Sequence, residues 1–273
     1  MIVITGATGN VGRPLVELLA SAGQKVRALT RDPASARLPS GVEAARTQDL
    51  PLDGATSLFL NPAVVWGGAE EMISKATDGG VRRIVLLSSA AALDDDPGNM
   101  LATRHRDLEK AIEDAGVEWV FTRPGEFDAN ALGWAEKLRA GEPVREPFPG
   151  SRSAPIHEKD IAAVAARALL DDDLVGTRPL LTGPETITHP DQVRMIGEAI
   201  GRPTRFEEIT PEEAREEMLR LPYMRPGLVD VLLRLRAEAV DAPEEISPEV
   251  ERITGRPPRA FAEWAADHAD DFR

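Results

Sequence analysis

The chain has 273 residues, with 46 acidic against 32 basic side chains and a formal charge of −14. This balance argues against nucleic acid or an anionic membrane as a partner, because both would repel the chain. The absence of cysteine excludes disulfides, thiolate zinc sites and a cysteine nucleophile, and no two of the four histidines stand at ligand spacing. We expect no metal site. No apolar run is long enough to span a bilayer, and no basic leader opens the chain, so we expect a cytoplasmic protein.

The first half of the chain alternates short apolar runs with helical patterns, which is typical of a parallel sheet with helical crossovers. The predicted strands are 2–5, 25–31, 42–46, 57–61, 84–88 and 119–122. The predicted helices are 11–22, 69–77 and 101–115. The fold class is therefore α/β, with a doubly wound parallel sheet of the Rossmann type.

One connection is shorter than the others. Only about ten residues, 47–56, separate the third and fourth predicted strands, and they include Pro51 and Gly54. A helical crossover between parallel strands normally takes a dozen or more residues, whereas an extended loop can cover the distance. We predict a reduced or missing helix here. Part of one sheet face would then be exposed, or covered by the C-terminal segment or by another subunit, and the last case would favour a homodimer.

The pattern changes after residue 127. The expected elements are a helix at 128–138, a loop rich in Pro and Gly at 141–150, a helix at 160–170 capped by Asp160 and a short strand at 179–182. The remaining third is helical in pattern. The sequence thus predicts a Rossmann domain made of 1–127 plus about 155–183. It also predicts a smaller, mostly helical C-terminal domain made of 128–154 and 184–273, which would bind the substrate.

A glycine-rich segment, GATGNVG, lies directly between the first predicted strand and the first predicted helix. In a dinucleotide site, Gly6 permits a tight turn, Gly9 lets the backbone approach a pyrophosphate, and Gly12 lets helix and strand pack closely. The backbone amides near Asn10 and Val11 would be free donors for an anion at the helix start. Glycines at three-residue spacing in this position predict dinucleotide binding rather than an ordinary strand–helix turn.

The end of the second predicted strand decides between NAD and NADP. A carboxylate there would bind the adenine ribose hydroxyls and repel a 2′-phosphate. Thr30 and Arg31 occupy the positions expected to read the ribose, and a guanidinium suits a phosphate dianion. We assign Asp32 to the cap of the turn before Pro33. The sequence therefore favours NADP, as NADPH, over NAD.

Several segments together resemble the NmrA-like branch of the atypical short-chain dehydrogenases. They are ITGATGNVGR, TRDP, LLSSA, TRPGEF, PIHEKDIA, LLTGPE and ITGRPPRAFAEWAADH, and they extend over nearly the whole chain. The resemblance implies a Rossmann domain that binds NAD(P) and a small C-terminal domain that closes over a substrate cleft. By match of position, it implies that the cofactor is lined by Gly6, Thr8, Gly9, Asn10, Val11, Arg31, Asn61, Ser88 and Pro124.

Short-chain dehydrogenases usually protonate a carbonyl oxygen with a tyrosine that a lysine four residues on activates. The only tyrosine here, Tyr223, is followed at that spacing by Gly227, so the pair is absent. The helix expected to carry it has His105 and Glu109 instead. We slightly favour His105 as a buried packing residue. The alternative makes it a general acid near the nicotinamide, with Glu109 fixing its tautomer or raising its pKa.

Two serines and five aromatic residues are further candidates. Ser88 and Ser89 end a central strand, where they could bond the nicotinamide ribose or a substrate carbonyl, or simply cap the strand end. Each aromatic residue alone fits a core position, but together they could line an apolar substrate pocket: Trp66, Phe127, Trp134, Phe148 and Tyr223.

The favoured function is an NADPH-dependent oxidoreductase acting on a small apolar carbonyl, enone or quinone. Enones and quinones are electrophilic enough for a weak or solvent-derived acid to replace the tyrosine. One alternative is a non-catalytic NADP-binding redox sensor that signals to a protein partner. The other is a non-redox isomerase or cyclase on the same fold.

Overall fold

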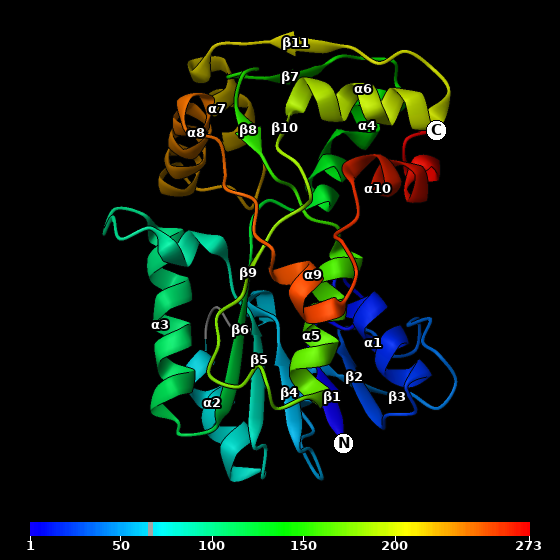
Figure 1. Ribbon diagram of the computed structural model, residues 1–273, viewed down its shortest axis with the longest axis vertical. Coiled ribbons are helices and arrows are strands. Elements are labelled where there is room, and N and C mark those ends of the chain that lie inside the picture. Colours follow the sequence, from blue (N-terminus) through cyan, green and yellow to red (C-terminus); the bar gives the residue numbers. More distant parts are fainter. Residues whose placement is uncertain (65–67) are drawn as a thin grey trace.

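A seven-stranded, wholly parallel sheet forms the centre of the computed structural model, which describes residues 1–64 and 68–273 (Figure 1). Its order is β3-β2-β1-β4-β5-β6-β9. The strands are β1 (Ile2–Ile4), β2 (Val26–Thr30), β3 (Glu43–Arg46), β4 (Ser57–Leu60), β5 (Arg83–Leu87), β6 (Glu118–Pro124) and β9 (Leu180–Leu181). The order reverses between β1 and β4, so ligands are expected at the carboxyl ends of these strands. The predicted Rossmann-type fold is confirmed.

Helices cover both faces of the sheet, which explains why its central strands are continuously apolar. On one face, α1 (Gly12–Ser21) and α5 (Glu158–Leu170) share a core with alternate residues of the strands. On the other face, α2 (Ala69–Asp78) and α3 (Met100–Asp114) enclose a second core. A late helix, α9 (Glu249–Thr254), packs against α5 (Figure 1). It therefore joins the sheet's core although it lies within the range predicted for the smaller domain.

The short third connection contains no α-helix. Between β3 and β4 there is only a 3-10 turn, η1 (Thr47–Asp49), so the prediction of a reduced helix is confirmed. The chain leaves this turn at Leu50 with φ +38°, a left-handed conformation that non-glycine residues rarely adopt. A cavity of about 880 Å³ lies beside this turn, and Thr47 and Gln48 of η1 line it.

A smaller part of the molecule lies beyond the carboxyl ends of the strands (Figure 1). Its helices are α4 (Ala135–Arg139), α6 (His189–Ile200), α7 (Pro211–Leu219), α8 (Pro226–Asp241) and α10 (Phe261–Asp267). Its strands pair two by two, β7 (Val144–Glu146) with β11 (Phe206–Glu208) and β8 (Arg152–Ser153) with β10 (Ile187–Thr188). A core of its own, centred on Phe261, Trp264 and Phe272, holds these elements together.

Two local predictions for this part were wrong, and a third was confirmed in altered form. The segment expected to be helical at 128–138 begins as a 3-10 helix, η4 (Asp128–Trp134), and continues as the short α4. The expected loop at 141–150 contains β7, and the last third contains strands as well as helices. These short strands form because each finds a partner far along the chain, which local patterns do not reveal.

Asp160 does not cap α5. The cap is His157, whose Nδ1 accepts the Lys159 amide at 3.2 Å. Asp160 instead accepts the backbone amide of Arg259 at 2.7 Å and also bonds its guanidinium. The aspartate therefore ties α5 to the chain just before α10.

Candidate functional site

The glycine-rich loop has the backbone that its sequence predicts. Gly6 has φ +64°, and its carbonyl accepts the Gly9 amide at 3.0 Å to close the tight turn. At Gly12, a side chain would collide with the Gly6 carbonyl and the Ala7 Cα, so only glycine allows α1 to pack this closely on β1. Val11 stands at the N-cap of α1 and makes no side-chain capping hydrogen bond. The start of α1 therefore offers backbone amides and the positive end of a helix dipole to an anion.

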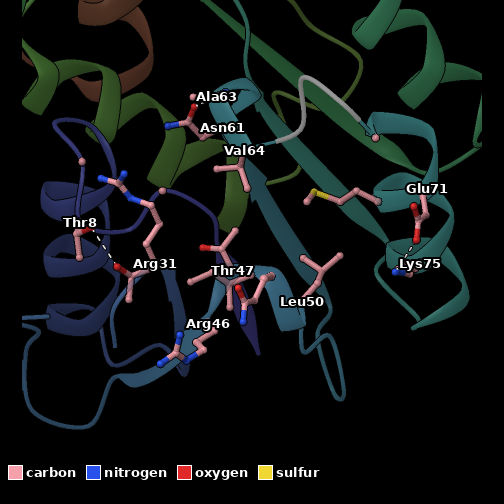
Figure 2. Close-up of a pocket in the computed structure, with 17 residues that line it drawn as sticks. Thr8, Arg31, Arg46, Thr47, Leu50, Asn61, Ala63, Val64, Glu71 and Lys75 are labelled. Carbon is pink, nitrogen blue, oxygen red and sulfur yellow. Dashed lines mark hydrogen bonds and ion pairs between the residues drawn. The ribbon is translucent and has the colours of Figure 1, made fainter. Parts of the chain in front are cut away.

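A cavity of about 880 Å³ opens beside this loop (Figure 2). Of the residues expected to hold a cofactor, it is lined by Gly6, Thr8, Gly9, Arg31 and Asn61. Its other lining residues come from β2, β3, η1, the 3-10 turn η2 (Pro62–Val64) and α2: Leu29, Thr30, Arg46, Thr47, Gln48, Leu50, Ala63, Val64, Gly68, Glu71, Met72 and Lys75. Figure 2 shows Thr8 and Arg31 on one side and the Glu71–Lys75 ion pair, at 2.7 Å, on the other. The cavity wall at Thr47 and Gln48 is thus formed by η1, the connection that has no crossover helix.

A second cavity, of about 580 Å³, lies at the end of β2 and is lined by three guanidinium groups. Arg31 was expected there, whereas Arg13 and Arg37 were not singled out from the sequence. The side chains of Thr8 and Thr30, which also line it, are linked by a hydrogen bond of 3.3 Å between their hydroxyl groups. Such a cluster suits a phosphate dianion.

Asp32 also lines this second cavity, but its carboxylate is engaged in the following turn. Its Oδ1 accepts the Ala34 amide at 3.2 Å, as expected for a turn cap. A side-chain hydrogen bond from Ser35 lowers the pKa of Asp32, so the group is ionised at neutral pH. The lining thus combines three cations with one anion and remains positively charged.

Asn61, Asn10 and Pro124 are also among the predicted cofactor residues. The Asn61 side chain rests where a Cβ of Gly6 would be, and its backbone amide donates to Thr5 Oγ1 at 2.7 Å. Asn10 lines a cavity of about 380 Å³ on the outer side of the loop. Pro124 lies at the end of β6, and β1, β4 and β5 stand between this strand and β2 in the sheet.

Ser88, which follows β5, belongs to a buried ionic cluster. Its hydroxyl donates to Glu109 Oε1 at 2.5 Å. The same carboxylate binds Arg123 through two hydrogen bonds, of 2.9 and 2.5 Å. This pairing joins α3 to the end of β6 and directs the Ser88 proton toward Glu109. Ser89 caps the 3-10 turn η3 (Ala90–Leu93), because its Oγ accepts the Ala91 amide at 3.1 Å.

His105 lies in the interior, with 5% of its surface exposed. Burial is the main reason that its pKa falls to about 4; the charge of Glu109 opposes this shift and that of Arg123 adds to it. The imidazole is therefore neutral at neutral pH. The direction is opposite to the raised pKa that a general acid supported by Glu109 would have, and the burial agrees with the packing interpretation.

Of the five aromatic candidates, the four that the structure describes do not line the cavities at the glycine loop. Trp66 lies outside the described residues. Phe127 and Trp134 are half-buried against the core of the smaller part, and Phe148 follows β7 with φ +56°. Tyr223, between α7 and α8, is 67% exposed. Their role as a substrate pocket stays a prediction.

Sequence patterns missed a group of polar residues beyond the end of β6. Glu126 accepts a hydrogen bond from Ser153 at 2.6 Å and lies 3.3 Å from His189 Nε2. Burial opposes its ionisation, but the hydrogen bonds from His189 and Ser153 outweigh burial and lower the pKa of Glu126 to about 2. Glu126 stands in the TRPGEF segment, which is the only sequence signal for this group.

Glu244 reaches the same place from the segment between α8 and α9. Its Oε2 accepts the Ala154 amide at 2.9 Å. Burial, with the nearby charge of Glu126, raises the pKa of Glu244. No local motif surrounds this residue, so nothing in the sequence could have singled it out.

Comparison with known proteins agrees with this geometry. Residues 6–172 match a family model described as NAD(P)H-binding. Over its full length the chain is 35% identical to a (4-alkanoyl-5-oxo-2,5-dihydrofuran-3-yl)methyl phosphate reductase of Streptomyces griseus, covering 99% of that protein. It is 31% identical to an NAD(P)H azoreductase of Xenophilus azovorans, again over its full length and 99% of the relative. The chain belongs to the NAD(P)H-binding reductase family.

The fold of this reductase is also that of known enzymes. A crystal structure of an NADPH-dependent quinone oxidoreductase from Escherichia coli, complexed with NADPH, superposes with a TM-score of 0.80 at 23% identity, covering 98% of this chain and 99% of the other. The resemblance drawn from the sequence motifs is thus confirmed as an NAD(P)H-binding Rossmann protein and an oxidoreductase. Among the described residues, no helix has the length and apolar character needed to cross a membrane.

Proposed function

We propose that this reductase uses NADPH to reduce small, apolar, electron-poor acceptors of the enone, quinone or carbonyl class. The observation that carries the choice of NADPH is the cavity at the end of β2, where Arg13, Arg31 and Arg37 converge beside the glycine loop. Their guanidinium groups fit a 2′-phosphate, and the amides at the start of α1 fit a pyrophosphate. When bound, the reduced coenzyme supplies a hydride.

The class of acceptor follows from what the chain lacks. Without a tyrosine–lysine pair, a weakly electrophilic ketone would receive little help, whereas enones and quinones need less activation. The names of the relatives support this choice, because a dihydrofuranone phosphate, an azo compound and a quinone are all electron-poor. We place the substrate between the carboxyl ends of β5 and β6 and the smaller part, made of 128–154 and 184–273 without α9.

The chain's own residues would orient the reactants and exclude water. The buried Ser88–Glu109–Arg123 cluster fixes the ends of β5 and β6, against which the reacting part of the coenzyme would lie. The elements that close over these ends come from the smaller part, which would keep the reaction away from solvent.

The proposal is tested by following NADPH absorbance with a panel of enones, quinones, azo compounds and simple ketones, with NADH as the matched donor. We expect consumption with the first three classes, and more efficient use of NADPH than of NADH. Flat absorbance across the panel, with NADPH binding intact by calorimetry, would contradict the reductase proposal and favour the sensor. Turnover without net NADPH consumption would favour the isomerase or cyclase.

A further inference from the structure

A seven-residue connection, 242–248, joins α8 to α9; we call it the strap. Figure 1 shows it crossing the middle of the molecule, between the sheet and the smaller part. Two hydrogen bonds fix it there. Glu244 accepts the Ala154 amide at 2.9 Å, and the Ser247 amide donates to the buried Thr182 Oγ1 at 2.9 Å. The strap is thus tied to the segments that border the end of β9.

The strap places a carboxyl group at the reacting end of the proposed coenzyme site. The arginines at β2 fix the adenine end, and the glycine loop fixes the phosphates. The remaining part of a dinucleotide must therefore extend the other way, past Asn61 and toward the ends of β5 and β6. Gly125 comes directly after β6, and the Glu244 carboxylate lies so close to it that a methyl group at 125 would overlap the carboxylate.

The other groups near this end are poorly suited to give up a proton. The Ser88 hydroxyl is directed to Glu109, and Ser89 caps a turn. His105 is buried and neutral, and a neutral imidazole is a very weak acid. Glu126 is held as a carboxylate by His189 and Ser153.

Glu126 and Glu244 are neighbouring carboxyl groups whose surroundings shift their pKa values in opposite directions. Glu126 has two hydrogen-bonding partners and Arg236 nearby, which favour its charged form. Glu244 is half-buried beside that charge; this partial burial raises its pKa, and the backbone amide of Ala154 opposes the shift. Pairs with opposite shifts of this kind commonly divide the acid and base roles of an active site.

We propose that Glu244 is the proton donor of the reduction. This inference rests on the proposed function. In the reduction of an enone, the hydride of NADPH forms the new C–H bond at the β-carbon and leaves NADP⁺, and the C=C electron pair moves to give an enolate. The Glu244 carboxyl proton then forms the C–H bond at the α-carbon, which yields the saturated ketone. Glu244 is left as a carboxylate and regains its proton from water.

The basicity of the anion that hydride transfer produces decides how much a positioned proton donor accelerates the reaction. The enolate from an enone is strongly basic and benefits from a positioned acid. The hydroquinone anion from a quinone is a weak base, so water can protonate it. Enone reduction should depend on Glu244 much more than quinone reduction does.

The variant Glu244→Gln separates proton transfer from anchoring, because the glutamine carbonyl can still accept the Ala154 amide and fill the space on Gly125. We expect kcat for an enone to fall by about 100-fold, the size of a general-acid contribution. KM, the Kd for NADPH and the melting temperature should stay close to wild type, and quinone reduction should fall by less than about tenfold. Glu245→Gln, at the exposed neighbouring position, is the matched control and should behave as wild type.

A readout that needs no turnover completes the experiment. Infrared difference spectra at neutral pH should contain the carbonyl band of a protonated carboxylic acid that Glu244→Gln removes and Glu245→Gln keeps. An active wild type with an equally active Glu244→Gln, or with no such band, overturns the assignment of Glu244 and leaves the reductase proposal standing. A wild type that binds NADPH but oxidises it with none of the acceptors on the panel overturns both.

Discussion

The two ends of the coenzyme site are built in different ways. At the proposed adenine and phosphate end, the glycine loop and the arginines come from one stretch of chain, residues 6–37, which presents backbone amides and exposed guanidinium groups. The reacting end is assembled from distant segments, and its cluster of Ser88, Glu109 and Arg123 is buried. A mobile anion in water can be held by a local motif and surplus positive charge. Control over a proton requires burial and neighbours brought together by the whole fold.

Removing one partner of the buried cluster should have the largest effect. Glu109→Ala leaves Arg123 buried without its main counter-charge, so we expect the free energy of unfolding to fall by about 3–5 kcal/mol. Asp114→Ala on the same helix removes only an exposed pair with Lys110, which solvent screens, so its loss of stability should be much smaller. Urea denaturation of both variants measures the difference. Equal stabilities would break the comparison between a buried and a solvated end.

The second prediction concerns pH. Asp128, two residues after Glu126, has no exposed surface and no hydrogen-bond partner among the described residues for either carboxylate oxygen. Burial, reinforced by the facing carboxylates of Glu158, Asp160 and Glu126 and opposed by His268, raises its pKa to about 8. The unfolded value is near 4. Its contribution to stability is therefore fully present below about pH 4 and is lost as the pH rises through 8.

The variant Asp128→Asn cannot ionise. Relative to this variant, the wild type should lose about 3–4 kcal/mol of stability between pH 5 and pH 8. Denaturation curves of both proteins at the two pH values give the free energy of unfolding of the wild type minus that of the variant. Because all other groups titrate in both proteins, their contributions cancel in this difference to first order. A wild type and variant with parallel pH profiles would show that Asp128 titrates normally.

The smallest effect is expected at the solvated end. Arg31→Ala should raise the Kd for NADPH by about 10- to 100-fold and leave NADH binding nearly unchanged, because a hydrogen bond to a charged group contributes about 1.5–3 kcal/mol. The matched control is Arg82→Ala. Arg82 is an exposed arginine just before β5, at the amino-terminal end of the strands, so its loss should change the Kd of neither NADPH nor NADH. The loss should shrink at high salt. Equal losses for both coenzymes would sharpen the comparison by assigning Arg31 to the shared pyrophosphate.

The same contrast explains what the sequence could reveal. The turn at Gly6, the close packing at Gly12 and the missing crossover helix were predictable because each is decided by a few consecutive residues. Asp160 was assigned to a cap by its position, but the fold pairs it with Arg259, 99 residues away. Glu109 was paired with its helical neighbour His105, whereas its hydrogen-bonding partners come from two strand ends.

The turn η1, which replaces the third crossover helix, makes one wall of the adenine-side cavity a loop of about ten residues rather than a packed element. Loops accept insertions and deletions at little thermodynamic cost. We therefore expect that an exchange of residues 47–56 for a longer segment would change the wall of this cavity without disturbing Glu244, the proposed proton donor. Under the proposed function, coenzyme binding and acceptor chemistry could then evolve independently in this fold.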